Sequence, residues 1–182
     1  MTAEHFVSFW DLAVKFAEEQ KDAIVVIRPK DPDSYKNLSS ELTERFLGLK
    51  EQINGLDNLF IVDSLRWSFI ETIGTSDVVI SQGMTSFSMI AIICGIEGLY
   101  LDQANYKHPF SRLYRDILVF DDPKKINLML KDIILDKRSP LKEVEEKIMR
   151  NFDAYADDRG IDIFRNVLSG QEIKNFGEPI YA

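Results

Sequence analysis

The sequence is poor in the residues that build metal centres and disulfides. It has one cysteine, Cys94, and two histidines, His5 and His108. A single cysteine excludes a disulfide within the chain, and no group of cysteines and histidines has the spacing of a zinc site. We therefore expect no metal site, and we interpret Cys94, inside an apolar helix, as a small buried hydrophobe.

Long apolar runs and excess positive charge are also missing. The longest apolar run, MIAIICGI at residues 89–96, is far shorter than the roughly 20 residues that a membrane-spanning helix needs. The N-terminal apolar stretch carries charges, unlike a signal peptide. The net charge of −8 disfavours binding to nucleic acid or anionic lipid, but it leaves room for one local basic pocket. These features predict a soluble, cytoplasmic protein.

What the sequence does contain is an alternation of helical and strand-like apolar spacing. Strands are expected at residues 23–29, 58–63, 77–81, 98–102 and 117–122. Helices are expected at residues 5–20, 40–53, 64–76, 85–94, 139–155 and 158–170, with another beginning at Asp122 and Pro123. The β-branched run at 23–29 is typical of a strand that is buried on both faces.

This order predicts an α/β fold, a Rossmann-like parallel sheet of about five or six strands with helices on both faces. We expect one domain at residues 1–170 and an irregular tail at 171–182. The first expected element is a helix, whereas such domains usually open on a strand. We therefore expect a piece of a longer protein, the C-terminal half of a two-domain one.

Ligands of open parallel sheets bind beyond the carboxyl ends of the strands. The turn SQGMTS follows the third expected strand and opens a helix, whose free amides and partial positive charge favour phosphate. Gly83 would let the backbone approach an anion, and Ser81, Thr85 and Ser86 would add hydroxyl donors. The alternative is that these residues only cap the helix and turn the chain. The turn matches neither a Walker loop nor GxGxxG.

Other polar residues follow the remaining strands. Arg28 and Lys30 lie beyond the first strand, where they either meet a phosphate or form a solvated pair. The loop at residues 102–114 is rich in aromatic side chains, and its His108 is a candidate for contacts to a base or sugar or for loop packing. Arg159 and Gly160 stand at an expected helix start.

Three segments together resemble the C-terminal, donor-binding half of GT-B glycosyltransferases. They are AIVVIRPKD, the run from LFIVD to GLYLDQ, and DAYADDRGIDIFRNVL, so the resemblance spans roughly residues 5–170. The most similar members are bacterial surface-carbohydrate and capsule-biosynthesis enzymes and CDP-glycerol glycerophosphotransferases. In that group an Arg-Pro strand end, a Ser/Thr-rich turn before a helix and a late Arg-Gly helix start occur in this order.

The resemblance implies a nucleotide-sugar or CDP-linked donor as substrate, with no cofactor and no metal. It implies that the diphosphate is held at Ser81, Gly83, Met84, Thr85 and Ser86. It also implies that the same donor is contacted by Arg28, Lys30, Asp102 or Gln103, His108 and Arg159. The turn departs from many relatives, which have more glycine or serine where Gln82 and Met84 stand.

The resemblance also implies partners and limits. Such enzymes commonly keep their catalytic base in an N-terminal acceptor-binding domain, which these residues lack, so the chain alone would transfer little. Peripheral membrane association would then come through the longer protein. Two alternatives stay open: a sugar-nucleotide epimerase-like domain, and an α/β interaction module without a nucleotide. The transferase interpretation requires that the first-turn amides of the helix at 85–94 be open to a ligand.

Overall fold

The computed structural model describes residues 2–30, 36, 38–64 and 66–152. The chain divides into two compact units, residues 1–140 and 141–182. The second unit begins within helix α7 (Pro140–Phe152). The expected domain boundary at residue 170, the expected helix at 158–170 and Arg159 all lie outside the described residues.

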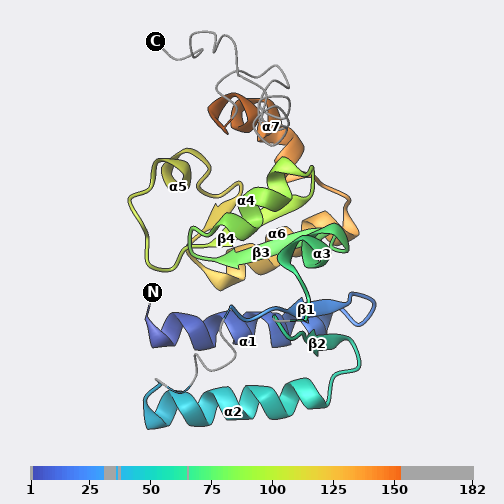
Figure 1. Ribbon diagram of the computed structural model, residues 1–182, viewed down its shortest axis with the longest axis vertical. Coiled ribbons are helices and arrows are strands. Elements are labelled where there is room, and N and C mark those ends of the chain that lie inside the picture. Colours follow the sequence, from blue (N-terminus) through green and yellow to red (C-terminus); the bar gives the residue numbers. More distant parts are fainter. Residues whose placement is uncertain (1, 31–35, 37, 65, 153–182) are drawn as a thin grey trace, which may run out of the picture. The chain divides into compact units, whose positions relative to one another are not determined.

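Helices and strands alternate along the first unit (Figure 1). They are α1 (Ala3–Glu19), β1 (Val25–Ile27), α2 (Ser40–Asn54), β2 (Leu59–Ile61), α3 (Phe69–Gly74), β3 (Val78–Gln82), α4 (Ser86–Ile93), β4 (Glu97–Leu101), α5 (Pro109–Leu113), β5 (Val119–Phe120) and α6 (Pro123–Leu135). Each expected strand is present and overlaps its expected range. The predicted α/β class is therefore confirmed.

Helix starts follow the local capping chemistry. α6 begins as expected, because the Asp122 carboxylate accepts a hydrogen bond from the Lys124 amide at 2.8 Å and Pro123 occupies the first turn. The prediction that a helix starts near Ser64 is wrong. Ser68 caps α3 instead, since its hydroxyl accepts from the Glu71 amide at 3.2 Å. The short helix α5 was not expected.

The strands form two parallel sheets rather than the single sheet that was expected. β1 pairs with β2, and β3, β4 and β5 form a second sheet in that order. Neither sheet reaches the predicted five or six strands. The division falls between β1 and β3, which share no ladder among the described residues.

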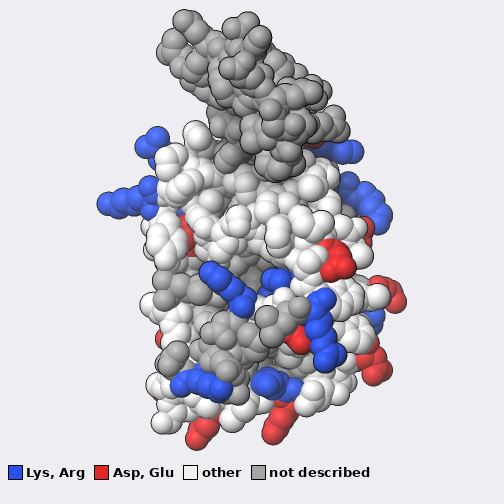
Figure 2. Space-filling model, viewed as in Figure 1, with Lys and Arg blue, Asp and Glu red and all other residues white. Residues whose placement is uncertain are grey.

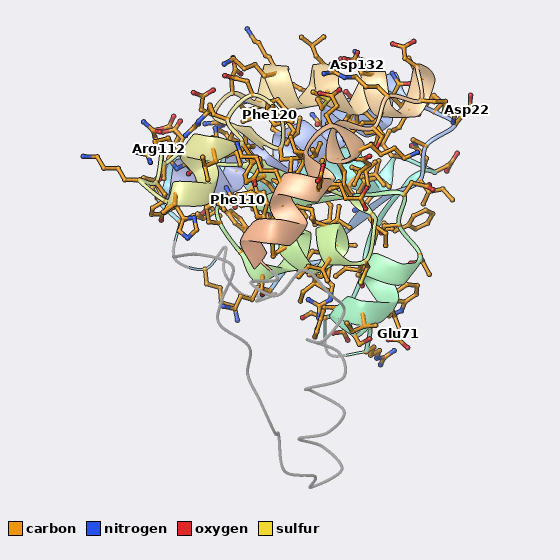
Figure 3. The ribbon with its side chains drawn as sticks, turned by 90° about the horizontal axis from the view of Figure 1, so that it is seen from above. Asp22, Glu71, Phe110, Arg112, Phe120 and Asp132 are labelled. Carbon is orange, nitrogen blue, oxygen red and sulfur yellow. The ribbon has the colours of Figure 1, made fainter. Side chains whose placement is uncertain are left out.

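Helices cover the sheets in layers. α1 packs against α2 and α6, and α6 packs against β4 and β5. α4 packs against β3, β4 and α3, and Figure 3 shows α6 and α4 on opposite sides of the larger sheet. The buried cluster between α1, α2 and the smaller sheet consists of Val7, Trp10, Val14, Ala17, Ile27, Phe46, Leu49, Ile53 and Leu59.

Among the described residues, helices cover only one face of the smaller sheet, so the prediction of a first strand buried on both faces is wrong. Ile27 and Leu59 are buried toward α1 and α2. On the other face Ile24 is 75% exposed, Val26 41% and Phe60 49%. Val26 and Phe60 are register partners, so they share this face.

Two expectations from composition concerned the burial of Cys94 and membrane-spanning helices. The interpretation of Cys94 as buried is wrong: it is exposed, because it is the C-cap residue of α4 and lies beyond the packed part of that helix. None of the described helices is both long and apolar enough to cross a membrane.

Candidate functional site

The turn between β3 and α4 is built around Gly83. Its φ of +67° lies in the left-handed region, where a side chain would strain the backbone. Its amide donates to the Leu101 carbonyl at 2.8 Å, and its carbonyl accepts from the Thr85 amide at 3.0 Å. These bonds tie the turn to β4 and fix how the chain enters α4.

Ser81 is part of the interior rather than of an open surface. Its hydroxyl accepts from the Ser88 amide at 3.0 Å and lies 2.7 Å from the Ser88 hydroxyl. The Ser88 hydroxyl in turn donates to the Leu99 carbonyl at 2.8 Å. Ser81 is 5% exposed, so it caps the third amide of α4 and is not available to a ligand.

The first two amides of α4 are open. Neither Ser86 nor Phe87 has a backbone hydrogen-bond partner among the described residues, and the Thr85 side chain does not cap the helix. The side chains of Thr85 and Ser86 are exposed. Unpaired amides at a helix start carry partial positive charge, so this turn is chemically suited to an anion.

Arg28 brings a full positive charge to the same turn. Its Nε donates to the Trp67 carbonyl and its Nη2 to the Ser64 carbonyl, both at 3.2 Å. These two bonds hold the guanidinium with its Cζ 6.0 Å from the centre of the Phe87 ring. A side chain from the end of β1 therefore lies over an aromatic ring in the first turn of α4.

Lys30 is exposed at the end of the described segment that follows β1. Figure 2 shows lysine and arginine side chains on either side of a hollow near the middle of the face drawn. Acidic side chains lie near the same hollow.

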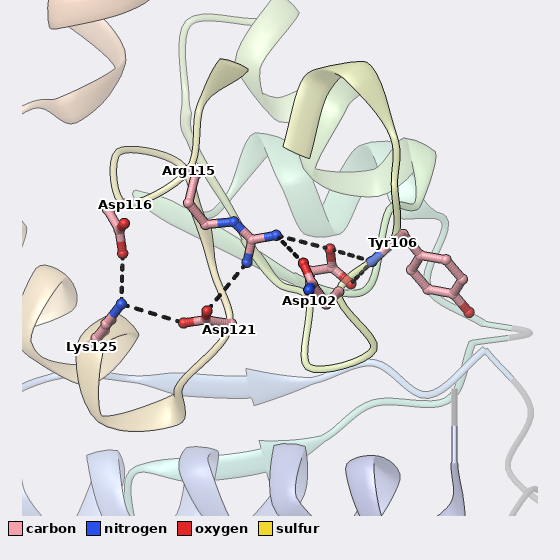
Figure 4. Close-up of polar contacts among 7 residues, drawn as sticks. Asp102, Tyr106, Arg115, Asp116, Asp121 and Lys125 are labelled. Atoms are coloured by element: carbon pink, nitrogen blue, oxygen red, sulfur yellow. Dashed lines mark hydrogen bonds and ion pairs between the residues drawn. The ribbon is translucent and has the colours of Figure 1, made fainter. Parts of the chain in front are cut away.

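Asp102, predicted to touch a donor, is held by its own loop (Figure 4). Its side chain is fully buried and accepts from the Tyr106 amide at 3.0 and 3.2 Å. Arg115 lies 3.7 Å from it and 3.6 Å from Asp121. Asp102 thus positions the loop that places Tyr106 beside Gly83. A Cβ added at Gly83 would lie 3.9 Å from the Tyr106 ring.

The outer part of this network is exposed. Lys125 contacts Asp116 at 2.8 Å and Asp121 at 3.4 Å. The hydrogen bond that Lys125 donates to Asp116 and the negative charges of both carboxylates raise the pKa of Lys125 above its ordinary value. The network joins the ends of β4 and β5 to the start of α6 and has no surplus positive charge for a ligand.

Gln103 and His108 are used by the fold. The Gln103 side-chain amide donates to the Ser8 hydroxyl of α1 at 3.1 Å. His108 caps α5, because its Nδ1 accepts from the Phe110 amide at 3.2 Å. An imidazole whose Nδ1 is bonded in this way has only Nε2 for a substrate.

The structure thus brings part of the predicted set together. Arg28 and the turn of Gly83, Met84, Thr85 and Ser86 lie around the start of α4, whereas Ser81, Asp102, Gln103 and His108 have structural partners. Sequence reasoning missed the role of Phe87 beneath Arg28 and the pairing of Arg115 with Asp102. Of these two, only Phe87 could have been found from the sequence, because it is an aromatic residue in the first turn of a helix that follows a strand end.

Other chemistry is sparse in the described part of the chain. No group of three or more His, Cys, Asp or Glu side chains there is placed to hold a metal ion. A hollow of about 160 Å³ lies between α1 and α2, lined by Val7, Asp11, Arg45, Gly48, Leu49 and Gln52. It is formed by helix side chains away from the strand ends.

The first turn of α4 therefore has two open amides beside a left-handed glycine turn, and the anchored Arg28 lies over its Phe87 ring. Comparison with protein-family models, curated proteins and solved structures finds no match.

Proposed function

We propose that this chain is the donor-binding domain of a metal-independent glycosyltransferase of the GT-B type, with a Rossmann-like fold. The donor's diphosphate binds at the first turn of α4. The observation that carries the proposal is that the first turn of α4 has open Ser86 and Phe87 amides and that the Arg28 guanidinium lies over the Phe87 ring of the same turn. Backbone amides at a helix start and an arginine are a common combination for phosphate recognition.

The proposed chemistry is group transfer from a nucleotide-linked donor, in the assembly of a bacterial surface polysaccharide. An acceptor hydroxyl forms a bond to the donor carbon as the bond to the leaving phosphate breaks. The hydroxyl proton passes to a base in an acceptor-binding domain outside these residues. The amides and Arg28 stabilise the negative charge that develops on the leaving group, which is the role a metal ion plays in other transferases.

Titration calorimetry with UDP, CDP and GDP tests this proposal on the full chain. We expect one of the three to bind, and Arg28→Ala to weaken it by about ten- to a hundredfold, the range for a lost charge-assisted hydrogen bond. Gly83→Trp should abolish binding, because the turn requires a positive φ and borders Tyr106.

Arg45→Ala is the matched control. It removes the same charge from α2, where Arg45 pairs with Glu4 at 3.5 Å, and should leave nucleotide affinity unchanged. Absence of heat with all three nucleotides at millimolar concentration contradicts the donor site. An equal loss in the Arg28 and Arg45 variants would show that net charge, rather than the α4 site, attracts the nucleotide.

A second candidate function is an α/β interaction module without a nucleotide. The exposed apolar face of β1 and β2 favours it, because contiguous apolar surface usually marks a contact with another molecule. The same calorimetry separates the two functions, since an interaction module has no affinity for any of the nucleotides.

A further inference from the structure

The loop that follows β4 contains three tyrosine and phenylalanine side chains, and they have different environments. Phe110 is 4% exposed and Tyr114 1%, and their ring centres lie 4.5 Å apart. The ring centre of Phe110 also lies 5.5 Å from that of Tyr100 in β4. Tyr106, by contrast, is 47% exposed. Packing of the core therefore accounts for Phe110 and Tyr114 but not for Tyr106.

The backbone that leads into Tyr106 is held by a buried ion pair. Asp102, whose side chain is fully buried beside Arg115, accepts from the Tyr106 amide at 3.0 and 3.2 Å. The Asn105 amide donates to the Asp102 carbonyl at 3.1 Å, and the Asn105 side chain accepts from Arg115 Nη2 at 2.9 Å. Asn105 has a φ of +51°, a left-handed conformation that is costly for most side chains. Such strain beside an exposed ring is typical of a contact residue that is held in place before binding.

The ring of Tyr106 borders the turn that opens α4. Figure 4 shows the ring pointing away from Asp102 and Arg115. Its Cε2 atom would lie 3.9 Å from a Cβ added at Gly83, so the ring is within van der Waals range of the turn. Ser86, whose amide is open, follows Gly83 by three residues, and the chain between them can span at most about 11 Å. A nucleoside diphosphate has a length of this order, so one molecule can reach both the ring and the open amides.

We infer that Tyr106 stacks on the nucleobase of the ligand whose phosphates bind at the first turn of α4. The inference rests on the proposed function and adds to it the residue that makes the site prefer a nucleotide to a phosphate without a base. A tyrosine ring has a flat apolar face, and every base has a π-face that can stack on it. Tyr106 thus contributes affinity for the nucleoside part, whereas the amides and Arg28 bind the negative charge.

Titration calorimetry on the full chain tests the inference with two probes. One is inorganic pyrophosphate, and the other is whichever of UDP, CDP and GDP binds most tightly. The measured quantity is the ratio of the two affinities, because a substitution that only distorts the turn weakens both probes. Tyr106→Ala should weaken the nucleotide by about ten- to a hundredfold, the range for a base stacked on an aromatic side chain. It should leave the affinity for pyrophosphate unchanged.

Three further variants separate the ring from other causes. Tyr106→Phe keeps the ring and should bind both probes like the parent. Phe60→Ala is the matched control, since it removes a ring of similar exposure, 49%, from β2 and should change neither affinity. Arg28→Ala should weaken both probes, because a guanidinium binds the phosphates that the two probes share.

The results that overturn the inference differ from those that overturn the donor site. If Tyr106→Ala binds the nucleotide as tightly as the parent does, the donor site stands and the stacking contact is wrong. Equal weakening of both probes in this variant shows that Tyr106 supports the turn rather than a base. Weaker nucleotide binding in Tyr106→Phe or Phe60→Ala also contradicts stacking on Tyr106, as does equal affinity of the parent for both probes. Absence of heat with pyrophosphate and all three nucleotides overturns the donor site and the inference together.

Discussion

At the scale of single residues, Gly98 marks the closest approach of α4 to the larger sheet. An ideal Cβ at this position would lie 2.4 Å from the Ser88 carbonyl oxygen and 2.6 Å from Ile92 Cγ1. The first of these is backbone, so the helix itself would have to move. We expect Gly98→Ala to lower the free energy of unfolding of the first unit by about 1–3 kcal/mol, measured by urea unfolding.

Gly48 gives the matched control for this prediction. It lies inside α2, and nothing would lie within 4 Å of an added Cβ. Gly48→Ala should therefore raise the free energy of unfolding by about 0.5–1 kcal/mol, because glycine is a poor helix residue. If both substitutions shift the urea midpoint in the same direction, the close contact at Gly98 is not real.

The buried pair of Asp102 and Arg115 supports a second prediction. Arg115→Ala leaves a fully buried carboxylate without its counter-charge, and we expect a loss of about 3–5 kcal/mol in the free energy of unfolding. Adding Asp102→Asn should recover part of the loss, since the amide oxygen still accepts from Tyr106. Lys125→Ala removes only an exposed contact and should hardly move the urea midpoint. Equal effects of the two cation deletions would contradict this assignment.

At the scale of elements, α3 depends on the reciprocal cap between Ser68 and Glu71. The hydrogen bonds from the side chain and backbone of Ser68 lower the pKa of Glu71 below its ordinary value. Because its folded-state pKa is lowered, the ionised Glu71 stabilises the helix at pH values above the unfolded-state pKa of about 4.3. This stabilisation is lost as the pH falls through the folded-state pKa. We expect the amides of α3 to lose exchange protection as the pH drops below about 4.

The control for the pH effect is Glu71→Gln. Glutamine keeps the hydrogen-bond acceptor but has no charge to titrate, so the protection of α3, corrected for the intrinsic exchange rate, should no longer change over this range. An unchanged pH dependence in this variant would assign the effect to another acidic group.

The elements themselves were largely predictable from sequence. Apolar spacing placed α1 and α4, and apolar runs placed the strands, because both signals come from burial against a core. Helix-start residues placed α2 and α6. The start of α3 was misplaced because Ser64 and Ser68 are both acceptable caps and only Ser68 has Glu71 three residues later. α5 was missed because one helical turn has no period to recognise.

The candidate site was predictable only in part. The rule that ligands bind at strand ends identified Arg28 and the Gly83 turn. It cannot separate Thr85 and Ser86, which are exposed, from Ser81, which is turned inward to the Ser88 amide. That distinction depends on the alternation of β3, where Val79 and Ser81 face α4. Asp102 was misjudged because its partner, Arg115, is distant in sequence and follows no local pattern.

At the scale of the whole first unit, the division into two sheets was not visible in the sequence. The strand order follows from long-range pairing, and β1 and β3 read as ordinary interior strands. The proposed anion site does not depend on this division, because it needs only the ends of β1 and β3 and the start of α4.

The open face itself gives the last prediction. Ile24, Val26 and Phe60 form an apolar surface on the uncovered side of β1 and β2. In the double variant Val26→Lys/Phe60→Glu the two register partners carry opposite charges, which attract across the strands. We expect the fluorescence of a bound hydrophobic dye to fall severalfold, with an unfolding midpoint close to that of the parent, because exposed positions tolerate charge.

Leu128→Lys provides the comparison for the dye experiment. Leu128 is 62% exposed on α6, away from this face, and an isolated exposed leucine binds little dye. Its replacement should leave the fluorescence nearly unchanged. If the double variant retains the dye signal of the parent, then the apolar surface is already covered in solution, and the interaction-module alternative loses its structural basis.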